Sequence, residues 1–435
     1  MVDDGLCSQS TYESLNKCNL EQQVMTVYRG EQMGAWKNPI LLLSGIGISY
    51  LGSWIYLIAI NLSVLQATGS AAAVAGLYII RPIAVLITNT WAGSVIDRVN
   101  KRKLMIIVDI LRGVFVFCIP FLGSLWAIYG FLLLINIIGA FFGPASSVYI
   151  TKLIPAEKRQ RFNSIMSMMS SGAFLIGPAI SGILIMYVGT DLCIIINAIT
   201  FIICGFFIYL LPNVDENLEK AREPIHWKTL VNDWIIVKDF AKNARFFIMV
   251  YVLFQTAMLI GFALDSQEVT FIKKILELSD RDYGLIVSIT GLGSLMGAFV
   301  ATMLANKVNV KLYLGVGMLM TSVGYTLFYA SFDFLTATLA FVFLGFFMAF
   351  ANSGYATIFQ KNVPVHMMGR FGSMAEMLQG IVQIIFTLIL GFLAEWFSLQ
   401  FVCIIFAMVS ILFAISLLIM VLAPSKAAYF RVNND

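Results

Sequence analysis

The chain contains about twelve apolar runs, each long enough to cross a lipid bilayer as a helix. A helix needs roughly 20 residues to span about 30 Å of hydrocarbon, and backbone groups in lipid must bond within their own segment. The runs are continuous rather than alternating, which excludes β-strands. They lie approximately at 38–64, 74–96, 104–123, 127–149, 164–187, 192–211, 246–270, 284–305, 311–330, 333–358, 372–394 and 400–422. We therefore expect an all-α membrane protein.

Composition supports a multi-pass membrane protein. Hydrophobic residues make up 60% of the chain and charged residues 12%, whereas soluble domains have roughly 45–50% and 25%. The basic residues cluster in alternate loops. If the N-terminus is cytoplasmic, that side holds Arg98, Lys101, Arg102, Lys103, Lys152, Lys158, Arg159, Arg161, Lys307, Lys311, Lys361 and Arg370, and the other side keeps Lys273, Lys274 and Arg281. The bias predicts that both termini are cytoplasmic, and it explains the net charge of +4 without a nucleic-acid partner.

The chain resembles itself at a constant offset of 209 residues. Lys152, Pro155, Arg161, Phe162 and Ser164 align with Lys361, Pro364, Arg370, Phe371 and Ser373. One register over separated stretches predicts two six-helix bundles of the same design. Structural repeats with a ligand site between them are a recurring plan of secondary transporters.

The positions of the apolar runs divide the chain into five parts. They are a cytoplasmic N-terminal tail at 1–36, a six-helix bundle at 37–211, a cytoplasmic linker at 212–245, a second bundle at 246–423 and a cytoplasmic C-terminal tail at 424–435. The first tail is polar, which favours disorder over a short amphipathic helix. Apolar residues at near-helical spacing after Trp227 predict an interfacial helix in the linker.

Residues that would support enzymatic chemistry are missing from the apolar runs. The six cysteines have no metal or disulfide spacing, and His226 and His366 both fall in loops. The sequence also lacks a Walker A loop, a zinc motif and a nucleophile with a nearby base. We expect neither an enzyme nor an ATP-driven pump, with no metal and no cofactor.

A glycine, an Asp-Arg pair and a basic cluster stand between the second and third runs. The residues are Gly93, Asp97, Arg98, Lys101 and Arg102. This pattern resembles motif A of the major facilitator superfamily, with Asn100 in place of the usual second glycine. The resemblance implies a latch in which Asp97 meets the N-terminus of the eleventh span, near Met367 to Gly372. Alternatively, the basic residues are ordinary positive-inside anchors.

The fifth run carries a glycine- and proline-rich stretch, with Gly172, Gly177, Pro178 and Gly182. It is similar to motif C of exporters in the same superfamily, although Ser181 replaces one usual glycine. Small residues permit close helix packing, which is also their ordinary role in any membrane protein.

Charged residues inside the runs are candidates for function. Asp109 and Arg112 share a helix face and can neutralise each other. Arg81 has no such local partner, so its candidates are Asp265, Glu268 or an anionic group on a substrate. The candidates for carrying protons are Asp265, Asp109, Glu268 and Glu376. The first run lacks acids, which departs from the usual drug–proton antiporters.

Polar and aromatic stripes predict the lining of a substrate cavity. The residues are Tyr50, Trp54, Asn61, Asn136, Tyr251, Gln255, Met258, Phe262, Gln379 and Gln383. Such a lining suits amphipathic or weakly cationic molecules. Ordinary interhelical packing is the alternative for each position.

The spans, the repeat and both motifs resemble the major facilitator superfamily from Trp36 to Ala423. Pro144-Ala145, Lys152 to Pro155 and Gly369 to Phe371 resemble its bacterial macrolide-efflux and siderophore-exporter branch. The resemblance implies a monomer in a bacterial inner membrane that exports drugs or xenobiotics by proton antiport. An exporter of an endogenous metabolite, such as a siderophore or lipid-like molecule, and a non-transporting membrane sensor are the alternatives.

Overall fold

The computed structural model describes residues 6–88, 95–96, 99–214, 227–304 and 307–423, and no strand occurs in these ranges. Eleven helices in the described part of the chain are long and apolar enough to span a membrane. The predicted all-α membrane fold is therefore confirmed.

The N half comprises α1 to α7. Its elements are α1 (Leu6–Thr68), α2 (Ala71–Thr88), α4 (Lys101–Cys118) with the short 3₁₀ helix η1 (Ile119–Phe121), α5 (Leu125–Gly139), α6 (Phe142–Leu153) and α7 (Ala156–Tyr209). Helices α5 and α6 follow one another along a single span, Leu125–Leu153.

Helix α7 contains the fifth and sixth predicted spans. Its membrane stretch of 49 residues would be about 74 Å long if straight, twice what a bilayer requires. The chain turns at Gly189, whose φ of 78° and ψ of 173° are not helical and suit a residue without a side chain. Phe162 and Ile208, near the two ends of α7, pack in one core. The eleven apolar helices thus make twelve crossings.

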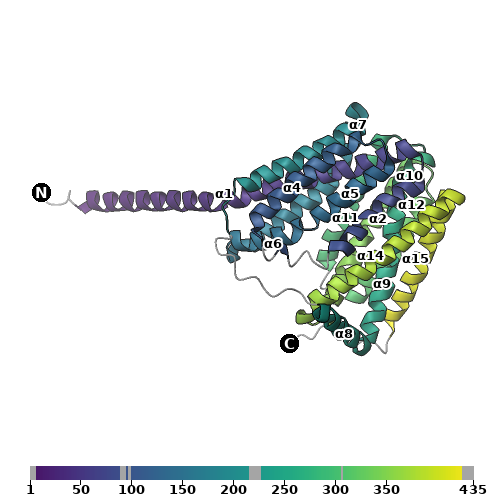
Figure 1. The fold of residues 1–435 in the computed structure, drawn as a ribbon. Coiled ribbons are helices and arrows are strands. Elements are labelled where there is room, and N and C mark those ends of the chain that lie inside the picture. Colours follow the sequence, from purple (N-terminus) through teal and green to yellow (C-terminus); the bar gives the residue numbers. More distant parts are fainter. Residues whose placement is uncertain (1–5, 89–94, 97–98, 215–226, 305–306, 424–435) are drawn as a thin grey trace.

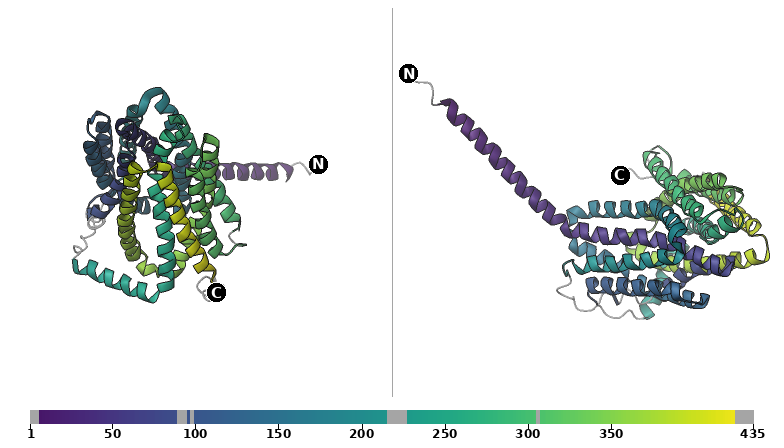
Figure 2. Two further views of the ribbon diagram at one scale, coloured as in Figure 1. Left: turned by 90° about the vertical axis from the view of Figure 1, so that its right-hand side faces the viewer. Right: turned by 90° about the horizontal axis from the view of Figure 1, so that it is seen from above.

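The N-terminal tail differs from our expectation of disorder. Helix α1 begins at Leu6 and continues into the first span without a break, and it projects from the bundle (Figures 1 and 2). The segment is polar but has no proline before Pro39 and many residues that favour helix, such as Glu, Gln, Leu and Lys. Local propensity therefore decides the conformation.

The C half comprises α9 to α15, preceded by the linker helix. The elements are α8 (Trp227–Asn243), α9 (Arg245–Asp265), α10 (Glu268–Lys274), α11 (Asp280–Leu304), α12 (Val310–Tyr329), α13 (Phe334–Asn362), α14 (Val365–Trp396) and α15 (Leu399–Leu422). The repeat is visible in local detail. Asn100 caps the N-terminus of α4 and Asn309 caps that of α12, each by accepting a backbone N–H bond at 3.0 Å.

The two halves meet at one end of the molecule and diverge toward the other (Figure 1). We call the side of α10 the α10 end and the side of α8 the linker end. One hydrophobic core at the α10 end contains residues of both halves, such as Ile58 and Phe271. Toward the linker end each half has its own core, around Met105 in the N half and Phe254 in the C half.

Candidate functional site

Small residues allow close contact between the halves toward the α10 end. Helix α7 meets α11 where a Cβ on Gly182 would lie 3.1 Å from Cα of Arg281, and one on Gly284 would lie 2.9 Å from Cα of Gly182. Helix α2 meets α14 where a Cβ on Gly391 would lie 2.9 Å from Cβ of Ala75. These contacts form the seam on which any movement of the halves depends.

Polar groups close the seam at its outer edge. The carboxylate of Glu395 in α14 accepts hydrogen bonds from Ser70 Oγ and from the backbone N–H of Ala72, the latter at 3.1 Å. It thereby caps the N-terminus of α2 from the other half, where a negative charge is favourable. Lys274 of α10 donates to the carbonyl of Gly69.

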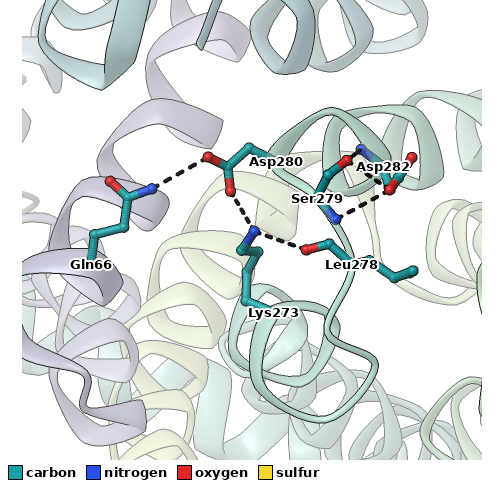
Figure 3. A network of polar contacts seen from close by, with 6 residues as sticks. All are labelled: Gln66, Lys273, Leu278, Ser279, Asp280 and Asp282. Atoms are coloured by element: carbon teal, nitrogen blue, oxygen red, sulfur yellow. Dashed lines mark hydrogen bonds and ion pairs between the residues drawn. The ribbon is translucent and has the colours of Figure 1, made fainter. Parts of the chain in front are cut away.

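A second polar network lies at the same end (Figure 3). Asp280 accepts a hydrogen bond from Gln66 of the N half at 3.3 Å and pairs with Lys273 at 2.6 Å. Lys273 also donates to the carbonyl of Leu278 at 2.8 Å. The network ties the end of α1 to the start of α11.

Two carboxyl groups lie just inside this closure, at the end of α9 and the start of α10. We call Asp265 and Glu268 the acidic pair. The hydroxyl of Tyr325 donates to Asp265 Oδ1 at 2.9 Å. Glu268 is half-buried, and its Oε1 is buried with no hydrogen-bond partner in the described part of the chain.

The acidic pair is surrounded by uncharged polar groups from both halves. Asn61 of α1 is fully buried and donates to Tyr78 of α2 at 3.0 Å and, more weakly, to Tyr283 of α11 at 3.5 Å. Glu268 is close enough to both tyrosines to interact electrostatically with their hydroxyl groups. Gln267, also fully buried, donates to the carbonyl of Ala71 at 3.3 Å.

The environment of Glu268 favours its neutral form. Burial raises the pKa of Glu268 well above its usual range, and the neighbouring Asp265 carboxylate raises that pKa further. No cation pairs with Glu268 among the described residues. A carboxyl held in this way takes up a proton when it is buried and releases it when it is hydrated.

Asp109 and Arg112 pair with each other instead of facing the seam. Asp109 is fully buried in α4, and its Oδ1 lies 3.8 Å from Arg112 Nη1. The guanidinium of Arg112 also lies 3.9 Å from the ring centroid of Phe201 in α7. The pair is therefore internal to the N half.

The motif A residues are only partly within the structure. Gly93, Asp97 and Arg98 lie outside the described residues. Arg102 donates to the carbonyls of Ile208, at 3.3 Å, and Tyr209 at the end of α7, where a cation is favourable. Lys101 is buried.

The motif C-like residues face different partners. Gly182 packs on α11, as described above, and Gly284 approaches the carbonyl of Pro178. Gly177 accommodates Trp54 of α1, since a Cβ there would lie 2.5 Å from Cβ of Trp54. A Cβ on Gly172 would meet open space.

The expected cavity residues divide into three groups. Gln379 of α14 donates to Tyr251 of α9 at 2.6 Å, and Gln255 bonds to both Tyr251 and Tyr355. Trp54 and Asn61 have the contacts given above, and Tyr50 and Gln383 are half-buried. By contrast, Met258 packs in the core of the C half, Phe262 is 39% exposed, and Asn136 bonds to its own helix at Leu132. Glu376 is exposed.

Several residues of the site were not predicted from the sequence. They are Tyr78, Gln267, Tyr283, Tyr325 and Glu395. Only Tyr78 had a usable signal, because it lies three residues before Arg81 and so shares its helix face. The others are brought together by tertiary packing between segments far apart in sequence.

Comparison with known proteins identifies one family. The family model described as Major Facilitator Superfamily matches residues 42–267 and again 267–432. The MFS-type transporter YfiS of Bacillus subtilis is 24% identical over 373 residues, which cover 84% of this chain and 88% of YfiS. Shorter matches include the putative bacilysin exporter BacE of Bacillus subtilis, 26% identical over 42% of this chain and 48% of BacE. The multidrug resistance protein MdtH of Cronobacter sakazakii is 25% identical over 40% of this chain and 43% of MdtH.

Solved structures agree on the fold. The nucleoside transporter NupG superposes with a TM-score of 0.67 at 16% identity, covering 88% of this chain and 99% of NupG. A POT family transporter in complex with a peptide gives a TM-score of 0.71 at 12% identity, covering 89% of this chain and 96% of that one. Identities this low establish the architecture alone.

Proposed function

Because the chain belongs to the Major Facilitator Superfamily, we propose that it exports an amphipathic small molecule by alternating access, with proton entry as the driving force. The observation that carries this proposal is the acidic pair, two carboxyl groups without a cationic partner at the seam between the halves. A drug or other xenobiotic is the leading substrate, since one relative, BacE, is named as a putative bacilysin exporter and another, MdtH, as a multidrug resistance protein.

The direction of opening follows from the charge of the loops. Basic residues such as Arg102, Lys152 and Lys361 lie at the linker end, which the positive-inside rule assigns to the cytoplasm. With this orientation, the conformation of the structure would be closed to the outside, and its two halves would diverge toward the cytoplasm. In this conformation the acidic pair is sealed from the external solution by Glu395, Lys274 and the Gln66–Asp280 contact.

Proton transport is coupled to the conformational change because the carboxyl groups of the acidic pair are hydrated in one conformation and buried in the other. When the α10 end opens, Asp265 and Glu268 are hydrated and exchange protons with the outside solution. Closure desolvates the carboxyl groups and commits these protons to the cytoplasmic side. Asp97 is proposed to act at the opposite end, where its latch would hold the cytoplasmic side closed during the other half of the cycle.

The free energy available is sufficient. One charge that crosses about 100 mV releases roughly 2.3 kcal/mol, and about 1.4 kcal/mol corresponds to a tenfold gradient. A single proton can therefore maintain roughly a 50-fold gradient of a neutral substrate.

Inside-out membrane vesicles test the proposal. Vesicles that contain the protein are expected to accumulate a fluorescent amphipathic dye, or a macrolide, when their lumen is acidified, and to lose it when a protonophore collapses the gradient. Vesicles without the protein provide the background. Accumulation that is unaffected by the protonophore would refute proton coupling, and export would then need another energy source.

A further inference from the structure

Arg81 is an isolated cation in the middle of helix α2. It is exposed to solvent, and it has no hydrogen bond or ion pair within the described part of the chain. It does not pair with Asp265 or Glu268, the two local candidates that the sequence offered. Unpaired charges are rare within membrane spans and are found facing the bundle interior or water.

The neighbours of Arg81 on its helix show where it points. Tyr78 lies one turn earlier on the same face and contacts Asn61 next to the acidic pair. Pro82, the next residue, faces Gly380 of α14 across the seam, where a Cβ would be 3.7 Å from Cβ of Pro82. Arg81 therefore shares the face of Tyr78, which contacts the fully buried Asn61, whereas Pro82, about 100° around the helix, marks the surface of α2 that packs against α14.

The opposing helices present neutral polar groups at the same level. Helices α2 and α14 run antiparallel, with Ala75 against Gly391 and Pro82 against Gly380, so Arg81 is level with Gln383. Gln383 lies on α14 between the face toward α2 and the face of Gln379, which bonds to Tyr251. Amide and phenol groups can bind a substrate, but they cannot neutralise a guanidinium.

We propose that Arg81 binds a carboxylate carried by the transported molecule. A guanidinium presents two parallel N–H donors that match the two oxygens of a carboxylate. A bound carboxylate would give Arg81 the counter-charge that the described residues do not supply. The side chain of Arg81 is exposed in this conformation, so a carboxylate can reach it.

The proposed proton antiport, on which this step rests, adds a second requirement, which concerns the net charge of the substrate. An anion bound to Arg81, one turn from Tyr78 on α2, would by itself favour protonation of the acidic pair, so protons and an anionic substrate would travel together. A positively charged amine has the opposite effect, because it competes with a proton for the same carboxylate. Antiport and a carboxylate site are compatible when the substrate is a zwitterion, with its carboxylate on Arg81 and its amine toward Asp265 and Glu268.

A matched set of ligands tests the charge preference on purified protein. The probes are phenylalanyl-phenylalanine, its methyl ester without the carboxylate and its N-acetyl derivative without the amine. Binding is read as the increase in melting temperature of the detergent-solubilised protein. In Arg81→Gln, the free dipeptide and the N-acetyl derivative are expected to bind roughly 10- to 100-fold more weakly, since a charged hydrogen-bonded pair is lost. Binding of the ester should be unchanged, which also shows that the variant is folded.

Arg245→Gln is the matched control, because it removes an arginine that is exposed at the start of α9. It should bind all three probes as the wild type does. The carboxylate site is refuted if neither carboxylate-bearing probe stabilises the wild type, or if Arg81→Gln binds them unchanged. Because no gradient is present, these results do not depend on whether transport is proton-coupled.

Proton release tests the second requirement. In weakly buffered solution the free dipeptide should displace protons from the wild type and the N-acetyl derivative should not. The other titratable groups that face the acidic pair are Tyr78, Tyr283, Tyr325 and Tyr329, phenols whose ordinary pKa is near 10. Protons released near neutral pH therefore come from the carboxyl groups. Equal proton release by both probes would refute competition by the amine.

Discussion

Replacement of both acids of the acidic pair, in the variant Asp265→Asn/Glu268→Gln, is expected to reduce gradient-driven accumulation from about 50-fold to about onefold. The amides keep the shape and the hydrogen bonding of the site, so the halves should still close around Asn61 and Gln267. Exchange of labelled for unlabelled substrate, which needs no proton, should persist. The measurement is uptake into inside-out vesicles, with and without a gradient.

The matched control is Glu277→Gln. Glu277 is an exposed carboxylate between α10 and α11, at the same end of the molecule. Its neutralisation should leave accumulation unchanged. A double variant that accumulates substrate like the wild type would exclude the acidic pair as the proton carrier and would direct attention to Glu376, which is exposed on α14.

Removal of the charge of Asp109 is expected to destabilise the protein by up to about 3–5 kcal/mol, because Asp109→Asn leaves the half-buried Arg112 without its counter-charge. The side chain of Asp109 is 1% exposed and that of Arg112 is 22% exposed. The double variant Asp109→Asn/Arg112→Gln should recover most of this loss. Unfolding in detergent, followed by fluorescence, measures the effect.

An exposed pair with the same spacing provides the control. Asp239 and Lys242 lie 3.7 Å apart on α8, and both side chains are at least 60% exposed. Asp239→Asn should therefore change the free energy of unfolding by less than about 1 kcal/mol. An Asp109→Asn variant that is as stable as the wild type but loses gradient-driven transport would assign proton coupling to Asp109 instead of a structural role.

The sequence predicts the architecture well because each span is determined locally. Length and continuous apolarity suffice for a helix in lipid, and the constant repeat offset matches a design with two related halves. The helix in the N-terminal tail was not predicted, because the polarity of this segment suggests disorder whereas its helix propensity decides the conformation. The junction inside α7 depends on the backbone of a single residue, Gly189, which the hydropathy pattern does not reveal.

The candidate site is only half predictable. Asp265 and Glu268 are recognisable because carboxyl groups stand out at the edge of an apolar run. Their surroundings are not, because the side chains of Asn61, Tyr283 and Tyr325 become neighbours only after the two halves pack. Glu395 resembles an ordinary residue at the end of a span, and its role as a cap on the other half is a tertiary feature.

The conformation of the α10 end is expected to depend on pH. The pKa of Glu268 is raised in the closed arrangement of the α10 end, so protons stabilise that arrangement. The stabilisation is fully present below the pKa of a hydrated Glu, near 4.3. It is lost as the pH rises through the raised pKa of Glu268. For one proton, the ratio of closed to open conformations falls by at most about tenfold per pH unit.

The most direct test of proton-controlled alternation is the distance across the α10 end as a function of pH. Spin labels at Trp126→Cys and Phe332→Cys, which are 79% and 77% exposed in the N and C halves, would report that distance once the six native cysteines are replaced. We predict a short distance at acidic pH, a growing population of longer distances as the pH rises, and a short distance at every pH in Asp265→Asn/Glu268→Gln. A distance that does not change with pH in the wild type, or a pH response that survives in the variant, would contradict the account.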